Sequence, residues 1–138
     1  MARKVFDLFV PIEPIGKGRH RTTKGGKSYP DPKTAKAEDR LRLFVSQSWG
    51  LGVLDQPLAV RIIAYMQRPA SKPKKVLFPT GKPDVDNQMK LVCDSLNGLC
   101  WRDDALIVDG GVRKRYCSPE FPTPGFHIMV YTLGEEDV

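Results

Sequence analysis

Acidic residues are concentrated in the segment from Asp84 to Asp94, and their spacing fits one face of a helix. Asp86, Lys90 and Asp94 follow at i, i+4 and i+8, so a helix places them in one row. Asp84 and Asp86 bracket the expected start of that helix, where the helix dipole favours negative charge. The apolar stripe of the same segment lies beside this row, which puts the charges at the border of the core.

A second pair of carboxylates, Asp103 and Asp104, follows just before an apolar run. A helix, a tight turn and a returning strand are expected to bring this pair back to the first aspartates. Carboxylates held together repel one another unless a cation joins them, and Mg²⁺ and Mn²⁺ prefer oxygen ligands. Such an ion assists phosphodiester cleavage, and a nearby cation such as Lys90 would stabilise the transition state. This chemistry would give the acidic segment a function.

Each part of the pattern also has a purely structural interpretation. Asp84 could be only an N-cap, because aspartate is favoured there. Asp86, Lys90 and Asp94 could form only a surface ladder of i, i+4 pairs. The pair at 103–104 could be a polar turn, and basic loops are commonly solvated surface. The conjunction of acidic and basic features favours a hydrolase over these alternatives.

Basic residues gather in loops on either side of the acidic segment. The chain has 22 Lys and Arg against 16 Asp and Glu, a formal net charge of +6. We expect the basic loops to capture the DNA backbone electrostatically, while metal ions mediate between the phosphates and the aspartates. The predicted DNA-binding residues are Lys17, Arg19, Arg21, Lys24, Lys27, Arg68, Lys72, Lys74, Lys75, Lys82, Arg113 and Lys114.

Length and composition predict one domain spanning residues 1–138. The chain has 138 residues and 41% hydrophobic content, enough to bury a core. No apolar run is long enough for a membrane span or a signal peptide. The three cysteines cannot all pair within one chain, which fits a reducing, cytoplasmic compartment. A zinc site is disfavoured because there is no C-x-x-C motif and the two histidines lie far apart.

The elements that position these residues are predicted in the order β-α-β-α-β-β, an α+β domain. Strands are expected at 5–10, 58–66, 105–116 and 126–133, and helices from about 33 to the glycines at 50 and 52 and from 84 to about 96. Residues 11–33 and 68–83 are rich in Gly, Pro and basic residues and are expected to be loops. Trp101 is expected to pack the turn before Asp103, the alternative being a wedge at a DNA crossover. The apolar stripe of the second helix is predicted as Val85, Met89, Val92, Cys93 and Leu96, ended by Asn97-Gly98.

The acidic segment resembles the RusA family of Holliday junction resolvases, which is common in prophages. The N-terminal prolines and the basic loop after them are also similar to phage-type members. The resemblance spans nearly the whole chain. Its residues are Lys82-Pro83-Asp84-Val85-Asp86-Asn87, Lys90, Asp94, Leu96-Asn97-Gly98, Trp101, Asp103, Asp104 and Lys114, with Pro11, Pro14, Lys17, Arg19, Arg21 and Tyr29 before them.

The resemblance implies a RusA-like α+β domain with a mixed β-sheet and two main helices. The implied activity is that of a homodimeric, Mg²⁺-dependent endodeoxyribonuclease, with Mn²⁺ as a substitute ion and no small-molecule cofactor. It would resolve four-way DNA junctions by symmetric paired incisions during recombination and repair. A two-fold symmetric dimer suits this substrate because a junction is itself two-fold symmetric.

The resemblance also assigns roles by motif. Asp84, Asp86 and Asp104 correspond to the catalytic, metal-binding carboxylates, and Lys90 corresponds to the catalytic lysine. His20 stands where family members often have Pro, and Leu106 replaces a common Gln, departures that bear on DNA preference more than on catalysis. The supporting residues are Asp94, Asp103 and Asn87.

Three other functions remain open at this point. The chain could be a non-catalytic junction-binding protein, or a metal nuclease that acts on flaps or replication forks. A dimeric interaction protein with an acidic binding face is the third. The aspartates with Lys90 favour catalysis, because a protein that only binds DNA gains nothing from carboxylates that repel phosphate.

Overall fold

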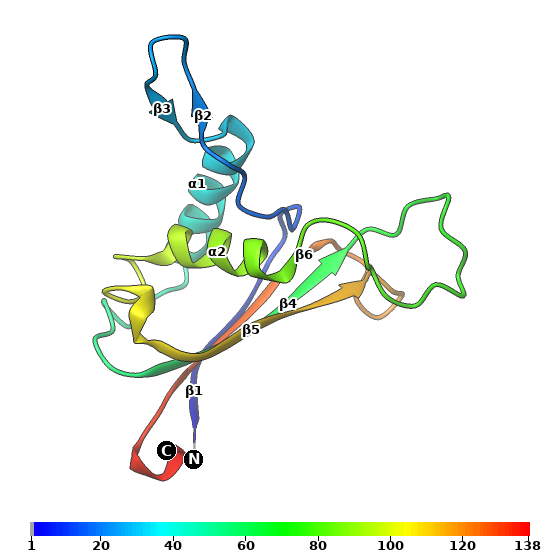
Figure 1. Cartoon of the computed structure of the whole chain (residues 1–138). Coiled ribbons are helices and arrows are strands. Elements are labelled where there is room, and N and C mark those ends of the chain that lie inside the picture. Colours follow the sequence, from blue (N-terminus) through cyan, green and yellow to red (C-terminus); the bar gives the residue numbers. More distant parts are fainter. Residues whose placement is uncertain (1) are drawn as a thin grey trace.

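Four strands form the central sheet of this computed structural model, which describes residues 2–138 (Figure 1). They lie in the order β1-β6-β4-β5. β6 runs antiparallel to both β1 and β4, whereas β5 runs parallel to β4. The mixed sheet implied by the resemblance is therefore confirmed. The strands are β1 (Arg3–Val10), β4 (Leu58–Met66), β5 (Ile107–Tyr116) and β6 (Gly125–Thr132).

Two helices, α1 (Pro32–Ser46) and α2 (Val85–Leu96), pack against each other and against the sheet (Figure 1). α1 begins after Asp31, whose carboxylate accepts a hydrogen bond of 3.1 Å from the Thr34 backbone N–H and so caps the helix. None of the described helices is long and apolar enough to cross a membrane. The core between helices and sheet includes Leu41, Val45, Val60, Ile62, Leu91, Leu96, Ile128 and Val130.

The direction of α2 follows from the parallel pairing of β4 and β5. A chain that leaves the end of one strand must return along the sheet before it can start a parallel neighbour, and α2 makes that return. Near the start of α2, the Gln88 amide lies 3.9 Å from the sulfur of Met66, the last residue of β4. The C-terminal end of α2 therefore lies toward the start of β5.

Two details of the predicted elements are wrong. Residues 11–33 are not entirely loop, because β2 (Arg21–Thr22) and β3 (Ser28–Tyr29) form a short antiparallel hairpin. Its turn uses Gly26 at φ 81°, a conformation that glycine adopts without strain. In α2, Val85 is 44% exposed and Gln88 is buried instead. Gln88 lies under the N-terminal prolines, where its Nε2 donates to the Pro14 carbonyl at 2.9 Å.

Trp101 packs the turn after α2, as predicted, and does not form an exposed wedge. Its side chain is fully buried, and its indole N–H donates to Asn97 Oδ1 at 2.7 Å. Two 3-10 turns complete the described chain: η1 (Asp104–Leu106) directly before β5, and η2 (Glu135–Asp137) near the C-terminus. All three cysteines are free in the described residues; Cys93 and Cys100 are buried, and Cys117 is partly buried.

Residues 11–18 form a strap that crosses the start of α2. The Lys17 backbone N–H donates to the Asn87 carbonyl at 2.9 Å, which fixes the strap on the first turn of the helix. At Gly16 the two backbones approach closely. A Cβ atom there would lie 2.9 Å from the Asn87 Cβ and 3.0 Å from the Pro83 Cβ. The strap can therefore lie this close only with glycine at position 16.

Gly16→Ala is expected to destabilise the fold by about 1–3 kcal/mol, because the strap must move away from α2 to admit the methyl group. Urea unfolding followed by circular dichroism measures the change. Gly50→Ala is the matched control, since a Cβ atom at residue 50 meets nothing within 4 Å. Equal unfolding midpoints for the two variants would contradict the close packing of the strap.

Candidate active site

The predicted metal-binding carboxylates lie at opposite ends of α2. Asp84 is the N-cap residue and Asp86 lies in the first turn. Asp104 lies near Asn97, the C-cap residue of the same helix, whose side chain acts to lower the pKa of Asp104. Residues 84 and 97 are 13 positions apart, which is about 20 Å along a helix that rises ~1.5 Å per residue. The helix therefore separates Asp104 from the other two.

Strand order explains this separation. Asp104 opens the 3-10 turn that leads into β5, and Ile107 at the start of β5 pairs with Leu58 at the start of β4. This end of the sheet is the one at which α2 finishes. β5 then carries the chain back toward the start of α2, where the Lys114 ammonium reaches the carbonyl oxygens of Gly81 and Pro83 at 2.7 and 3.0 Å. The residue of β5 that lies near Asp84 and Asp86 is therefore Lys114, and the aspartate pair lies at the other end of the strand.

The donor chemistry of the aspartates fits Mg²⁺, whose usual ligands are carboxylate oxygens and water. A single chain, however, does not bring three such carboxylates close together. Within residues 2–138, no three Asp, Glu, His or Cys side chains lie close enough together to hold an ion. The expectation that Asp84, Asp86 and Asp104 meet within a single chain is therefore wrong, because the turn after α2 leaves Asp104 at the far end of the helix.

The structure also does not show the two purely structural roles that were considered for the aspartates of α2, a helix cap and a ladder of ion pairs. Asp84 occupies the N-cap position, yet its carboxylate makes no capping hydrogen bond and pairs with Lys82 at 3.0 Å. Asp94 pairs with Lys17 at 2.8 Å, and no ion pair joins it or Asp86 to Lys90 among the described residues. Neither a capping role nor an i, i+4 ladder therefore accounts for these side chains. Asp103 does fit the polar-turn interpretation, since its carboxylate accepts from the Ala105 N–H.

The end of α2 near Asp104 is electronegative. Burial raises the pKa of Asp104 above its ordinary value, and the neighbouring carboxylates of Asp103 and Asp94 raise it further, against a smaller lowering by Asn97. Burial also raises the pKa of the Cys93 thiol to about 12, and the charges of Asp104 and Asp94 add to this shift. A cation placed here would relieve the repulsion among these groups.

A cavity of about 560 Å³ beside α2 brings five predicted site residues together. Asn87, Lys90 and Asp94 line it from the helix, and Lys17 and Arg19 line it from the strap and the residue that follows. Two cations of this group, Lys90 and Arg19, form no ion pair with a carboxylate of the described residues. The cavity therefore offers positive charge between the two groups of aspartates.

Lys17 is held by two carboxylates within the fold. Its ammonium lies 2.8 Å from Asp94 and 3.1 Å from Glu38, and its side chain is only 21% exposed. Burial alone would lower the pKa of Lys17, but the hydrogen bonds to Asp94 and Glu38 outweigh burial and raise it. Lys17 thus joins α1 to α2. The structure thus gives Lys17 a structural role, and its DNA-binding role stays a prediction.

Four other predicted DNA-binding cations also have partners within the fold. Arg68 donates to the carbonyl oxygens of Pro73 and Val76 and lies over the Tyr116 ring at 4.3 Å, so it holds the loop 68–83 in shape. Lys114 holds the end of the same loop through Gly81 and Pro83. Arg21 pairs with Asp31 at 2.8 Å, and the exposed Lys82 pairs with Asp84 at 3.0 Å. The remaining predicted cations are exposed: Arg19, Lys24, Lys27, Lys72, Lys74, Lys75 and Arg113.

Sequence reasoning missed a basic row on α1. Lys33, Lys36 and Arg40 line a hollow between α1 and the strap. Their i, i+3, i+7 spacing already places them on one helix face. This spacing is the signal that could have found them.

Asp104→Asn is expected to stabilise the metal-free protein at pH 7 by about 0.5 kcal/mol, a small effect because water screens this largely exposed group. The raised pKa means that ionisation of Asp104 lowers the stability of the folded chain. This loss of stability is complete at pH values above the pKa of the folded state, and it is absent at pH values below the pKa of the unfolded state. Urea unfolding in EDTA at pH 7 and pH 3 measures both differences. Asp39→Asn on the exposed face of α1 is the control, and a wild-type advantage at pH 7 would contradict the repulsion.

Comparison with known proteins matches the sequence of this chain to a family. The family model described as Endodeoxyribonuclease RusA matches residues 11–130, which include the strap, both helices and the aspartates. YqaN of Bacillus subtilis (strain 168) is 36% identical over 117 residues, covering 75% of this chain and 82% of the relative. The matched region contains every element that surrounds the candidate site. The chain is therefore a member of the RusA endodeoxyribonuclease family.

Proposed function

We propose that this protein is a Mg²⁺-dependent, structure-specific endodeoxyribonuclease that resolves four-way DNA junctions by paired incisions. One observation carries the proposal: in a chain of the RusA family, the motif aspartates lie at both ends of α2, with Lys90 in a cavity between them. The alternatives, a non-catalytic junction-binding protein and a nuclease for flaps or forks, would bind the same DNA backbone. They differ in whether and where the DNA is cut.

The protein acts as a homodimer because one chain leaves the aspartates divided. Asp84 and Asp86 lie at the N-terminal end of α2, and Asp104 lies at its C-terminal end. When two copies of α2 lie antiparallel across a two-fold axis, the start of each helix meets the end of the other. Asp84 and Asp86 of one copy and Asp104 of the partner then form one site, and the symmetry makes two such sites.

Each site would bind the ion through these aspartates, with Asp94 and Asp103 as supporting acids. The ion, when bound, offsets negative charge on the attacked phosphate and activates water. Lys90 and Arg19 line the adjoining cavity and bind the phosphate oxygens, where their charge stabilises the transition state. Asn87, also in the cavity wall, donates its side-chain N–H groups to the same oxygens.

The exposed lysines hold the arms of the junction. Lys24 and Lys27 lie on the β2–β3 hairpin, and Lys72, Lys74 and Lys75 lie on the loop 68–83; both segments project from the body of the molecule (Figure 1). Contacts from these lysines to phosphate provide affinity without sequence information. The arrangement separates capture of the DNA, at the projecting segments, from cleavage beside α2.

Asp86→Asn is expected to abolish cutting of a synthetic four-way junction in Mg²⁺ while junction binding is kept or tightened. The substitution removes a ligand of the ion together with a charge that repels phosphate. Gel assays of cleavage and of binding, with Asp39→Asn as control, measure both effects. Wild-type cutting by Asp86→Asn would refute the metal assignment, and a wild-type protein that binds but never cuts would favour the non-catalytic alternative.

A mixture of two inactive variants tests whether the site is shared between copies. Asp86→Asn and Asp104→Asn are each expected to be inactive alone. In a heterodimer of the two, one shared site carries both substitutions and the other carries neither, so the mixture should nick one strand of the junction. If each chain holds its own site, both sites of the heterodimer stay damaged and the mixture remains inactive.

A further inference from the structure

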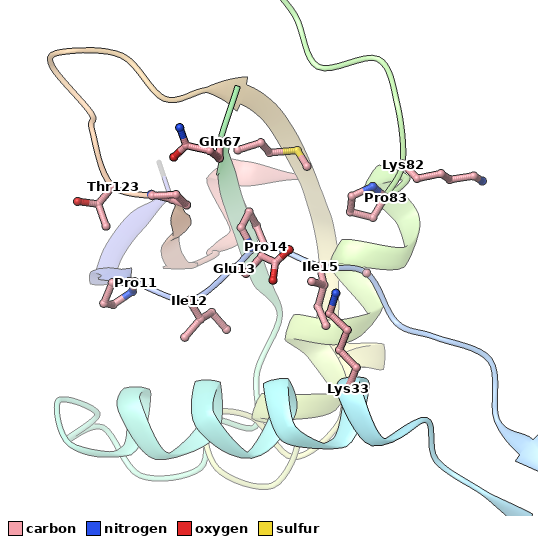
Figure 2. A pocket seen from close by; sticks show the side chains of 13 residues that line it. Pro11, Ile12, Glu13, Pro14, Ile15, Lys33, Gln67, Lys82, Pro83 and Thr123 are labelled. Atoms are coloured by element: carbon pink, nitrogen blue, oxygen red, sulfur yellow. The ribbon is translucent and has the colours of Figure 1, made fainter. Parts of the chain in front are cut away.

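A second cavity, of about 670 Å³, is lined by residues 11–16 of the strap and is separate from the cavity that Lys90 lines (Figure 2). Its walls come from the strap, the end of β4, the residues before α2 and the turn before β6. The apolar part of the wall includes Pro14, Ile15, Met66 and Pro83. Pro14 is fixed by the Gln88 amide, which donates to its carbonyl at 2.9 Å. Such a volume lies within the ~300–1,000 Å³ typical of small-molecule sites.

Polar side chains from three different segments line the cavity together with this apolar wall. Glu13 comes from the strap, Gln67 follows β4, and Thr123 lies in the turn before β6 (Figure 2). A carboxylate only accepts hydrogen bonds, an amide both donates and accepts, and a hydroxyl does either. An apolar wall with a few such groups suits a flat, polar-edged ring such as a nucleobase.

Positive charge at the rim fits a nucleotide rather than an uncharged ring. Lys33 and Lys82 line the cavity itself (Figure 2), and the adjoining hollow carries Lys36 and Arg40. These cations are complementary to the phosphates on either side of a base. Pro83, in the cavity wall, directly precedes Asp84. A base held here would therefore lie close to the aspartates at the start of α2.

We propose that this cavity accepts one unstacked nucleotide of the DNA next to the cleavage site and reads its base. The proposal rests on the proposed function and adds the place at which sequence preference arises. In an open junction, whose arms are not stacked on one another, the base pairs at the branch point lack a stacked neighbour on one side, so extrusion of a base costs less there than within a duplex. The pocket then selects junctions that present a fitting base at this position.

Glu13 sets the expected preference. Its carboxylate accepts a hydrogen bond from an exocyclic amino group, which cytosine, adenine and guanine possess and thymine lacks. Thymine in the cavity leaves Glu13 without that partner. We therefore expect junctions with thymine at the read position to be cut about fivefold more slowly than those with the preferred base, the effect of one lost hydrogen bond.

The first test detects the extruded base without relying on cleavage. Junctions that carry 2-aminopurine at successive positions around the cut are bound to the inactive Asp86→Asn protein, and fluorescence reports unstacking. One position is expected to brighten by about threefold or more. Thr123→Trp, which fills the cavity in the same background, should abolish the change, whereas Glu120→Trp in the same exposed turn should keep it. Junction binding without brightening at any position, or brightening that survives Thr123→Trp, would overturn the base site.

The second test measures cutting by the active protein on four junctions that differ only in the base at the brightened position. Glu13→Ala is expected to reduce the discrimination against thymine from about fivefold to less than about twofold. Glu120→Ala should retain it. Equal cutting of all four junctions by the wild type refutes base reading and leaves the resolvase proposal intact. A wild type that neither binds nor cuts junctions overturns the proposed function and the base site together.

Discussion

The parallel pairing of β4 with β5 is the constraint on which the arrangement of this molecule depends. It obliges the chain to return along the whole sheet between the two strands, and α2 is that return. The helix thereby acquires one end beside the strap and the other beside the turn before β5. Charged groups attached to the two ends are held about a helix length apart, and the buried stripe of α2 keeps that distance fixed.

The charges of the protein are divided between those that hold the fold and those that face solvent. Lys17, Arg68 and Lys114 bind carboxylates or carbonyl oxygens and each joins two segments of the chain. The aspartates near Asp104, in contrast, repel one another. A net charge of +6 therefore understates both features. The acidic groups that lack compensation lie beside α2, while exposed lysines are concentrated on projecting segments.

The helices and most strands can be predicted from the sequence because each has its own apolar period. Residues 58–66 are nearly all apolar and form β4 with those bounds. The direction of β5 cannot be predicted in this way, because β5 lies at the edge of the sheet and lacks the continuous apolar run that is typical of a parallel strand. That direction decides which end of α2 receives Asp104. The partners of Lys17 and Lys114 are likewise hidden from sequence patterns, because Glu38 and Gly81 are distant in the chain.

The strap is one backbone segment that serves as a wall for two hollows. Lys17 and Gly18 face the cavity with Lys90, while Glu13 and Pro14 face the larger cavity, and Gly16 lies at the crossing between them. Because its hydrogen bonds attach the strap to Asn87 and Gln88, it has little freedom to shift on one side alone. A substitution that displaces the strap would therefore change the walls of both hollows at once.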